Sequence, residues 1–247
     1  TPGNDSGGLS LSYKLSSRAF RTEVVAQNAQ NAISYLQVQD GALNSLGEIL
    51  NRFGELLTMA QDVTKKSSDI QSYNYEFIEL QREFDSISLE TFNDVSLFVV
   101  GKPGFSVDRG VGTLIDDDAQ RGGQSVPFDK FFRNLSLHPS GDQNSGSISI
   151  SMVNFDFIMA VNLGAVNPNY LTREPNGEEY INNILAISIG QIINALGKLS
   201  SARAENGAEQ NAVRKYNHLL QANLANLETA TGRIVDADIA KESTQLA

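Results

Sequence analysis

The sequence predicts an α+β protein, in which N- and C-terminal arms form a long antiparallel helical rod or bundle and a small β-rich domain is inserted in the middle. Three observations predict this fold. Both ends carry apolar residues at heptad spacing, these segments are nearly free of proline, and five of the six prolines lie between residues 99 and 178. Repeats of this length are typical of helices that bury a seam against other helices. We therefore expect an N-terminal arm at 1–98, an inserted outer domain at 99–178 and a C-terminal arm at 179–247.

The N-terminal arm is predicted to be one helix from about residue 9 to about residue 61. At about 1.5 Å per residue, such a helix is about 75 Å long. Gly41, Gly47 and Gly54 lie inside it but off the apolar stripe, and each is expected to cost up to about 1 kcal/mol relative to alanine. The stripe consists of Ala29, Ala32, Leu36, Leu43, Leu46, Leu50, Phe53, Leu57 and Ala60.

Two further helices are predicted. One follows a connection at 64–67 and ends near Glu90, and Ser68 and Gln71 have the spacing of a capping box at its start. The C-terminal arm is predicted as a single helix from about residue 179 to about residue 231. Stripes of this length bury one another when they bundle side by side, so the first and last arms should lie close together. The stripe of the C-terminal arm consists of Leu185, Ile192, Ala195, Leu199, Ala202, Val213, Tyr216, Leu220, Leu227, Ala230 and Ile234.

The middle segment differs in character, because it holds most of the prolines and half of the glycines. Short alternating or β-branched runs predict strands, and acidic or Ser/Gly-rich runs predict solvated loops. The predicted strands are 95–100, 111–115, 147–153 and 155–163, and the predicted loops are 116–118 and 140–146.

Composition excludes several classes of function. The formal charge is −10, from 29 acidic and 19 basic side chains. Such a surface repels phosphate backbones, so we expect no nucleic-acid binding. The chain contains no cysteine, which excludes a disulfide scaffold and thiolate metal sites. No apolar run is long enough to span a bilayer, and we find no N-terminal signal peptide.

Groups for catalysis are sparse. His138 and His218 lie 80 residues apart, and no HExxH motif accompanies them. The run Asp116-Asp117-Asp118 lacks the alternating acids, glycine and distal glutamate of an EF-hand loop, so a solvated turn is the better interpretation. We therefore predict a protein that is not an enzyme and has no catalytic, cofactor-binding or metal site.

Both arms carry short polar motifs. The second predicted helix ends in Thr91-Phe92-Asn93, and the last arm contains E-N-G-A-E-Q-N within residues 203–211. These motifs resemble those of bacterial flagellin, in which the first usually reads T-x-F-N-G. The matches occur in the same order at both ends and extend over roughly residues 1–98 and 180–247. The matching segments are residues 4–10, 27–34, 40–44, 91–93, 203–211, 226–230 and 233–242.

The resemblance implies a structural subunit of the bacterial flagellar filament, which serves motility. Its paired arms would form the wall of a tube by side contacts between copies, with the middle domain facing outward. The family's extreme terminal segments, which drive polymerisation, are not found, so we expect a monomeric fragment. The resemblance also implies export by the flagellar export apparatus without a cleaved signal peptide, and an extracellular location. Two alternatives stay open: a hook–filament junction protein, and a surface-exposed ligand-binding module carried by the middle domain.

One surface patch follows from the resemblance, namely Arg52, Glu55 and Leu56. Residues 50–56 occupy the place of the family's L-Q-R-x-R-E-L segment, although Asn51 and Gly54 depart from it. In the family this segment contacts neighbouring protofilaments and, in many members, an animal innate immune receptor. The simpler alternative is that Glu48, Arg52 and Glu55 form ordinary surface pairs, each contributing about 0.3–0.5 kcal/mol.

Overall fold

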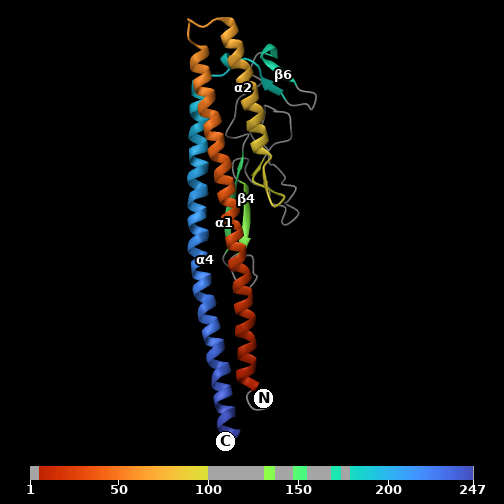
Figure 1. Cartoon of the computed structure of the whole chain (residues 1–247), viewed down its shortest axis with the longest axis vertical. Helices are drawn as coiled ribbons and strands as arrows, with labels where there is room; N and C mark the ends of the chain where they lie inside the picture. Colours follow the sequence, from red (N-terminus) through yellow and green to blue (C-terminus); the bar gives the residue numbers. More distant parts are fainter. Residues whose placement is uncertain (1–5, 100–130, 137–146, 155–167, 174–178, 247) are drawn as a thin grey trace. The chain divides into compact units, whose positions relative to one another are not determined.

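The computed structural model describes residues 6–99, 131–136, 147–154, 168–173 and 179–246 (Figure 1). The chain divides into two compact units. Unit 1 comprises residues 1–36, 134–150 and 208–247, and unit 2 comprises residues 37–133 and 151–207. The two longest elements, α1 (Ser6–Ala60) and α4 (Ile189–Leu246), each contribute to both units, and α2 (Ser67–Ser88) belongs to unit 2.

In unit 2, α1 and α4 pack against each other in antiparallel directions. A Cβ atom on Gly54 would contact Ile189 and Ile192, while one on Gly47, two turns earlier, would lie 3.3 Å from Leu199. An earlier residue of α1 thus lies against a later residue of α4, which shows that the two helices run in opposite directions. The whole predicted stripe of the N-terminal arm is buried, from Ala29 to Ala60, which confirms the heptad assignment of this arm.

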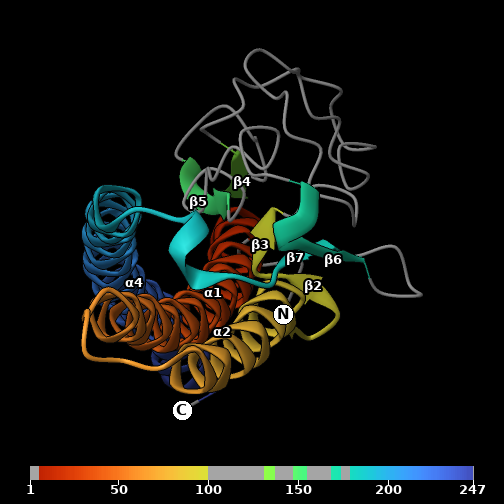
Figure 2. The same cartoon turned by 90° about the horizontal axis from the view of Figure 1, so that it is seen from above.

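The helix α2 covers a second face of α1, beside which it lies in both views (Figures 1 and 2). The rings of Phe53 on α1 and Phe77 on α2 meet edge to face, with centroids 4.7 Å apart. Such a pair adds about 0.5–1.5 kcal/mol to the stabilisation from its buried area. The core of unit 2 is therefore built by three helices.

Small sheets follow α2. The strands β1 (Thr91–Phe92) and β2 (Val95–Ser96) form an antiparallel hairpin. Its two-residue turn places Asn93 and Asp94 at φ 52° and 59°. These are the left-handed angles of a type I′ turn, which Asn and Asp tolerate better than most residues.

A second sheet has the strand order β3-β5-β4, formed by β3 (Phe98–Val99), β5 (Ser147–Asn154) and β4 (Phe131–Ser136). Within unit 2, β3 and β5 run parallel, with Phe98 opposite Val153. A third sheet pairs β6 (Leu171–Arg173) with β7 (Glu179–Ile181) in antiparallel directions. Two short 3-10 helices, η3 (Pro168–Tyr170) and η4 (Ile184–Ala186), flank this pair.

Amide side chains on α2 fasten the segment that leads into α4. Gln81 donates to the carbonyl oxygen of Ile181 at 2.9 Å and accepts from its N–H at 3.0 Å, as a neighbouring strand would. About two turns earlier on α2, Asn74 Oδ1 accepts a hydrogen bond from the N–H of Ile184 at 2.9 Å. These bonds satisfy backbone groups at the end of β7 and the start of η4.

In unit 1, the first part of α1 and the last part of α4 run antiparallel (Figure 1). The buried residues here include Ala29, Leu36, Val213 and Leu220. The two helices are linked by a hydrogen bond of 3.3 Å from Asn217 to Gln30. None of the residues from 7 to 21 is fully buried, and residues 8, 12, 15 and 19 are half-buried at helical spacing, so the described burial in this unit is deepest in the later turns of its α1 segment.

Three helix boundaries differ from the sequence prediction. The C-terminal helix begins at Ile189 rather than near residue 179, and it continues to Leu246 rather than ending near 231. Residues 179–181 form β7 instead, and Leu185, predicted in the stripe, lies in η4 and is 45% exposed. The late start of α4 has a physical reason, which is a capping box at Ser188. The Ser188 N–H donates to Gln191 Oε1 at 2.7 Å, and the Gln191 N–H donates to Ser188 Oγ at 3.3 Å.

The start of α2 was also predicted wrongly, by one turn at most. Lys66 takes the N-cap position, and its N–H donates to Asp69 Oδ2 at 3.1 Å. Because the lysine ammonium group has no acceptor, only this half of a capping box forms. The spacing of Ser68 and Gln71 therefore does not mark the helix start.

Among the strands, the prediction at 147–153 is confirmed by β5. The predicted strand at 95–100 is interrupted, because β2 and β3 belong to different sheets. The strands β1, β4, β6 and β7 were not predicted. The predicted strands at 111–115 and 155–163, and the loops at 116–118 and 140–146, lie outside the described residues.

Candidate functional site: helix faces of the arms

The predicted patch at Arg52 lies where α1 and α2 meet in unit 2. Arg52 Nε donates to Glu76 Oε1 on α2 at 2.5 Å, and Arg52 Nη1 donates to Glu55 Oε2 at 2.7 Å. The hydrogen bond to Glu76, and to a smaller extent the one to Glu55, raises the pKa of the Arg52 guanidinium above its usual value. The side chains of Arg52 and Glu55 are 40% and 62% exposed, and Leu56 is fully buried. Arg52 and Glu55 thus form a polar surface, and Leu56 packs beneath it.

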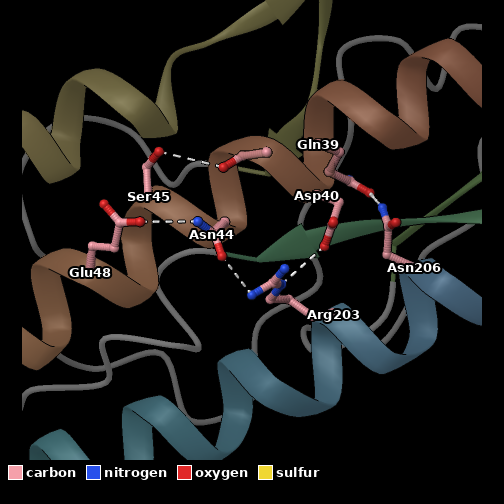
Figure 3. A network of polar contacts seen from close by, with 8 residues as sticks. Gln39, Asp40, Asn44, Ser45, Glu48, Arg203 and Asn206 are labelled. Atoms are coloured by element: carbon pink, nitrogen blue, oxygen red, sulfur yellow. Dashed lines mark hydrogen bonds and ion pairs between the residues drawn. The ribbon is translucent and has the colours of Figure 1, made fainter.

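A polar ladder crosses from α1 to α4 on the surface of unit 2 (Figure 3). Arg203 Nε donates to Asp40 Oδ1 at 3.0 Å, and Arg203 Nη1 donates to Asn44 Oδ1 at 2.9 Å. Asn44 Nδ2 in turn donates to Glu48 Oε1 at 3.1 Å. Because Arg203 and Asp40 are each more than a third exposed, water screens this pair, and such pairs contribute at most about 1 kcal/mol.

Beside this ladder lies a buried amide pair, Gln39 on α1 and Asn206 on α4 (Figure 3). Their exposed fractions are 0% and 2%, and Asn206 Nδ2 donates to Gln39 Oε1 at 2.7 Å. Neither residue was predicted from the sequence, because the heptad pattern rests on apolar side chains alone. The signal in the sequence is a polar residue at a stripe position on each helix. Gln39 lies seven residues from both Ala32 and Leu46, and Asn206 lies seven residues from both Leu199 and Val213.

In unit 1, the outer face of α1 exposes large apolar side chains at helical spacing. Leu9, Tyr13, Phe20 and Val24 are 37%, 70%, 67% and 40% exposed. Steps of four and seven residues place them on one side of a helix. We call these four residues the α1 apolar face.

The described residues contain little that could support catalysis. Among them, no three His, Cys, Asp or Glu side chains are placed to hold a metal ion together, and no helix is long and apolar enough to cross a membrane. His218 lies on α4, whereas His138 and Asp116–Asp118 fall outside this part of the chain. A cleft of about 510 Å³ beside α2 is lined by uncharged side chains, including Asn74, Tyr75 and Asn182.

Comparison with known proteins decides the family. The model of the bacterial flagellin N-terminal helical region matches residues 1–99, and that of the bacterial flagellin C-terminal helical region matches residues 189–247. The chain belongs to the flagellin family. The matched regions contain all of α1, α2 and α4, so the heptad stripes and the family assignment rest on the same elements. The resemblance found in the short motifs is confirmed.

Relatives of this flagellin match it along nearly its whole length. Flagellin of Bacillus subtilis (strain 168) is 29% identical, covering 98% of this chain and 77% of its own. Flagellin A of Vibrio anguillarum is 24% identical, with 98% and 81% covered. The flagellar filament 31.3 kDa core protein of Treponema maltophilum is 26% identical, with 97% and 75% covered.

A solved structure from Vibrio parahaemolyticus, provisionally assigned as a flagellar hook-associated protein, has a TM-score of 0.66 to this chain. It covers 94% of this chain and 100% of its own, at 14% identity. At that identity the likeness shows the fold alone, and it confirms the predicted pair of long packed helices with a few small strands in the middle.

This flagellin is a structural subunit of the flagellar filament, as its sequence predicted. Members of the family assemble with copies of themselves, and the filament that they build is extracellular. Neither the junction-protein nor the ligand-binding alternative is favoured by the relatives.

Proposed function

We propose that this flagellin serves the filament in a purely structural way, and that the α1 apolar face is a contact between subunits. The observation that carries the proposal is the row of Leu9, Tyr13, Phe20 and Val24, whose exposed fractions lie between 37% and 70%. A helix normally turns such a row toward another helix, because burying apolar area contributes about 25 cal/mol per Å². Contiguous exposed apolar side chains are typical of interaction surfaces.

A second copy of this chain is the partner that fits best. Self-assembly is a property of the family, so each copy meets identical copies at high local density. The face is uncharged, and it therefore offers packing rather than charge pairing. We expect an apolar helix face of a neighbouring subunit to lie against it, since two such faces bury each other.

The test replaces Tyr13 and Phe20 by serine in the full-length subunit and measures polymer formation by sedimentation and electron microscopy in ammonium sulfate, which favours apolar burial. We expect polymer yield to drop, while the far-ultraviolet circular dichroism stays helical. Tyr75→Ser is the matched control, because Tyr75 is similarly exposed, at 63%, but lies on α2. Equal polymer yield from the double variant and the parent would contradict the proposal.

We also propose Arg52 and Glu55 as a polar contact for a neighbouring subunit, with Leu56 supporting them from the core. The bonds to Glu76 and Glu55 hold the guanidinium in one orientation, which lowers the entropy lost on binding. An animal innate immune receptor is the second partner that the resemblance suggests for this patch. Arg52→Ala should weaken polymerisation, measured as a raised critical concentration. Arg82→Ala is the control, since Arg82 is paired with Glu79 within α2 and is exposed to a similar extent, 42%; an equal effect of both variants would argue against a specific patch.

We further propose that the subunit reaches the cell exterior through the flagellar export apparatus without a cleaved signal peptide. The support is the family assignment together with the extracellular filament that the relatives form. Mass spectrometry of the N-terminus of secreted protein tests this: an N-terminus shortened by a leader peptidase would contradict it.

A further inference from the structure

The heptad stripes of α1 and α4 are each interrupted by one amide residue within unit 2. Gln39 stands between Ala32 and Leu46 in the spacing of α1, and Asn206 stands between Leu199 and Val213 in that of α4. Both side chains are buried, with exposed fractions of 0% and 2%. A polar residue at a seam position forgoes the burial of an apolar side chain, so its retention calls for a compensating role.

The two amides meet, and Gln39 then reaches further. Asn206 Nδ2 donates to Gln39 Oε1 at 2.7 Å, while Gln39 Nε2 donates to the carbonyl oxygens of Leu97 at 2.8 Å and Ser151 at 3.3 Å. Both hydrogens of the Gln39 amide group are therefore used. One side chain of α1 is bonded at once to α4 and to the backbone of two other segments.

The two backbone segments that Gln39 contacts belong to β3 and β5 or lie next to them. Leu97 directly precedes β3 and is fully buried, and Ser151 lies within β5. The strands pair in parallel, with Phe98 opposite Val153. Gln39 thus bonds to both strands within two residues of their pairing, which fixes the level along α1 at which they are attached.

The same bonds oppose any sliding of α1 along α4. If α4 slipped by one turn, the bond from Asn206 Nδ2 to Gln39 Oε1 would break, and Asn206 would lie opposite the apolar stripe of α1 near Leu36 or Leu43. A buried polar group would then lose its hydrogen bond. Leucine residues at neighbouring stripe positions carry no such penalty, because one apolar contact replaces another. The exposed ladder of Arg203, Asp40 and Asn44 lies at the same level, but water can replace its bonds.

We propose that Gln39 and Asn206 are positioning residues of this flagellin: together they set the register of α1 against α4, and Gln39 holds β3 and β5 at one level on the arms. The proposal goes beyond the filament role and does not depend on which helix face contacts a neighbour.

The chain contains no cysteine, so engineered cysteine pairs can report the register directly. Gly47→Cys with Leu199→Cys reports the native register, because a Cβ on Gly47 would lie 3.3 Å from Leu199 Cδ2. Gly47→Cys combined with Ala195→Cys or Ala202→Cys reports a shift by about one turn in either direction. Disulfides form over a narrow range of Cα separations, which makes the three pairs selective.

Each pair is placed in the parent and in the Gln39→Met/Asn206→Leu variant, which keeps the side-chain volumes similar. We expect the variant to lose native disulfide yield and to gain the shifted disulfides that the parent does not form. Hydrogen exchange of the backbone amides in β3 and β5 should become faster, while the amides of β6 and β7 serve as the internal reference. Asp40→Ala, which removes only the exposed ladder bond, should leave both measurements unchanged.

A second variant separates the two roles. Asn206→Leu alone removes the bond across the seam but keeps Gln39 and its bonds to Leu97 and Ser151. It should loosen the register while exchange in β3 and β5 stays at the parent rate, and it serves as the test if the double variant does not fold. The proposal is overturned if both variants form only the native disulfide and exchange at the parent rate in β3 and β5.

Discussion

The helix α1 is continuous, yet its two parts are buried to very different degrees. In unit 2, residues 37–60 include Leu43, Leu46, Leu50 and Phe53, all with 0–1% of their surface exposed. In unit 1, none of residues 7–21 is buried, and Phe20 is 67% exposed. Heptad spacing alone does not account for this difference, because the helix is regular in both parts.

The difference follows from how many elements surround the helix in each unit. In unit 2, α1 packs against α4 on one side and α2 on another, and Gln39 adds bonds to two strands. In unit 1, α4 is the helix that accompanies α1 within the described residues, and this unit also holds residues 134–136 of β4 and 147–150 of β5. A helix that packs against one other helix buries one stripe toward it and can leave other apolar side chains exposed. The first arrangement buries α1 on several sides, and the second leaves the α1 apolar face exposed, as the proposed subunit contact requires.

The amide pairs of the two units show the same contrast. Gln39 and Asn206 are both buried, and both N–H groups of Gln39 donate. In unit 1, Gln30 is exposed, and its bond from Asn217 is longer, at 3.3 Å. Asn217 Oδ1 is buried and accepts no hydrogen bond from the part of the chain that the structure describes. The polar contact in unit 1 is therefore the weaker determinant of how its helices align.

The largest expected effect comes from comparing the same substitution in the two parts of α1. Phe53→Ala removes a fully buried ring from the three-helix core and should lower the free energy of unfolding by about 3–5 kcal/mol. Phe20→Ala removes an exposed ring and should change it by no more than about 0.5 kcal/mol. Urea unfolding followed by circular dichroism measures both. Similar losses for the two variants would mean that unit 1 buries Phe20 in solution.

A second comparison uses adjacent residues of α4 in unit 1. Leu220 is 2% exposed and Leu219 is 51% exposed. Leu220→Asp places an unpaired charge between the helices and should cost about 3 kcal/mol, seen as a lower thermal midpoint. Leu219→Asp places the same charge in water and should leave the midpoint nearly unchanged. If the Leu220→Asp melting curve matched that of the parent, the packing of α1 against α4 in unit 1 would be refuted.

The heptad pattern predicted burial better on α1 than on α4, where five predicted stripe positions are only half-buried. These are Ala202, Tyr216, Leu227, Ala230 and Ile234. Every predicted stripe position of α1 is buried, because the a and d positions of a heptad repeat face the helix that packs against them. Leu185 failed because its seven-residue spacing from Ile192 runs across the capping box at Ser188, where the helix has not yet begun. Counting periods does not reveal a helix boundary. The S-x-x-Q spacing marks one at Ser188, where the cap forms, but not at Ser68, because Lys66 takes the N-cap position of α2.

The candidate sites were harder to predict because they depend on contacts between distant segments. The sequence around Leu56 does not show that α2 packs on a second face of α1, and Leu56 is fully buried in the structure. The bond between Arg52 and Glu76 likewise joins two helices. Gln39 and Asn206 could have been found as paired interruptions of two stripes, but their bonds to Leu97 and Ser151 depend on strand placement.

The smallest expected effect tests how closely the arms approach in unit 2. Gly41 and Gly47 both lie in α1, and alanine favours a helix by up to about 1 kcal/mol over glycine. A Cβ on Gly41 meets nothing within 4 Å, whereas one on Gly47 meets Leu199 Cδ2 at 3.3 Å. Gly41→Ala should therefore raise the free energy of unfolding by about 0.5–1 kcal/mol, measured in urea.

For Gly47→Ala we expect little or none of that gain. Leu199 is 3% exposed and would have to move within a packed seam, which offsets the advantage of alanine in the helix. Because the two substitutions are chemically identical, the difference between them isolates the cost of moving Leu199. Equal stabilisation by both would show that the seam has room for a methyl group, and that close approach of α1 to α4 does not constrain Gly47.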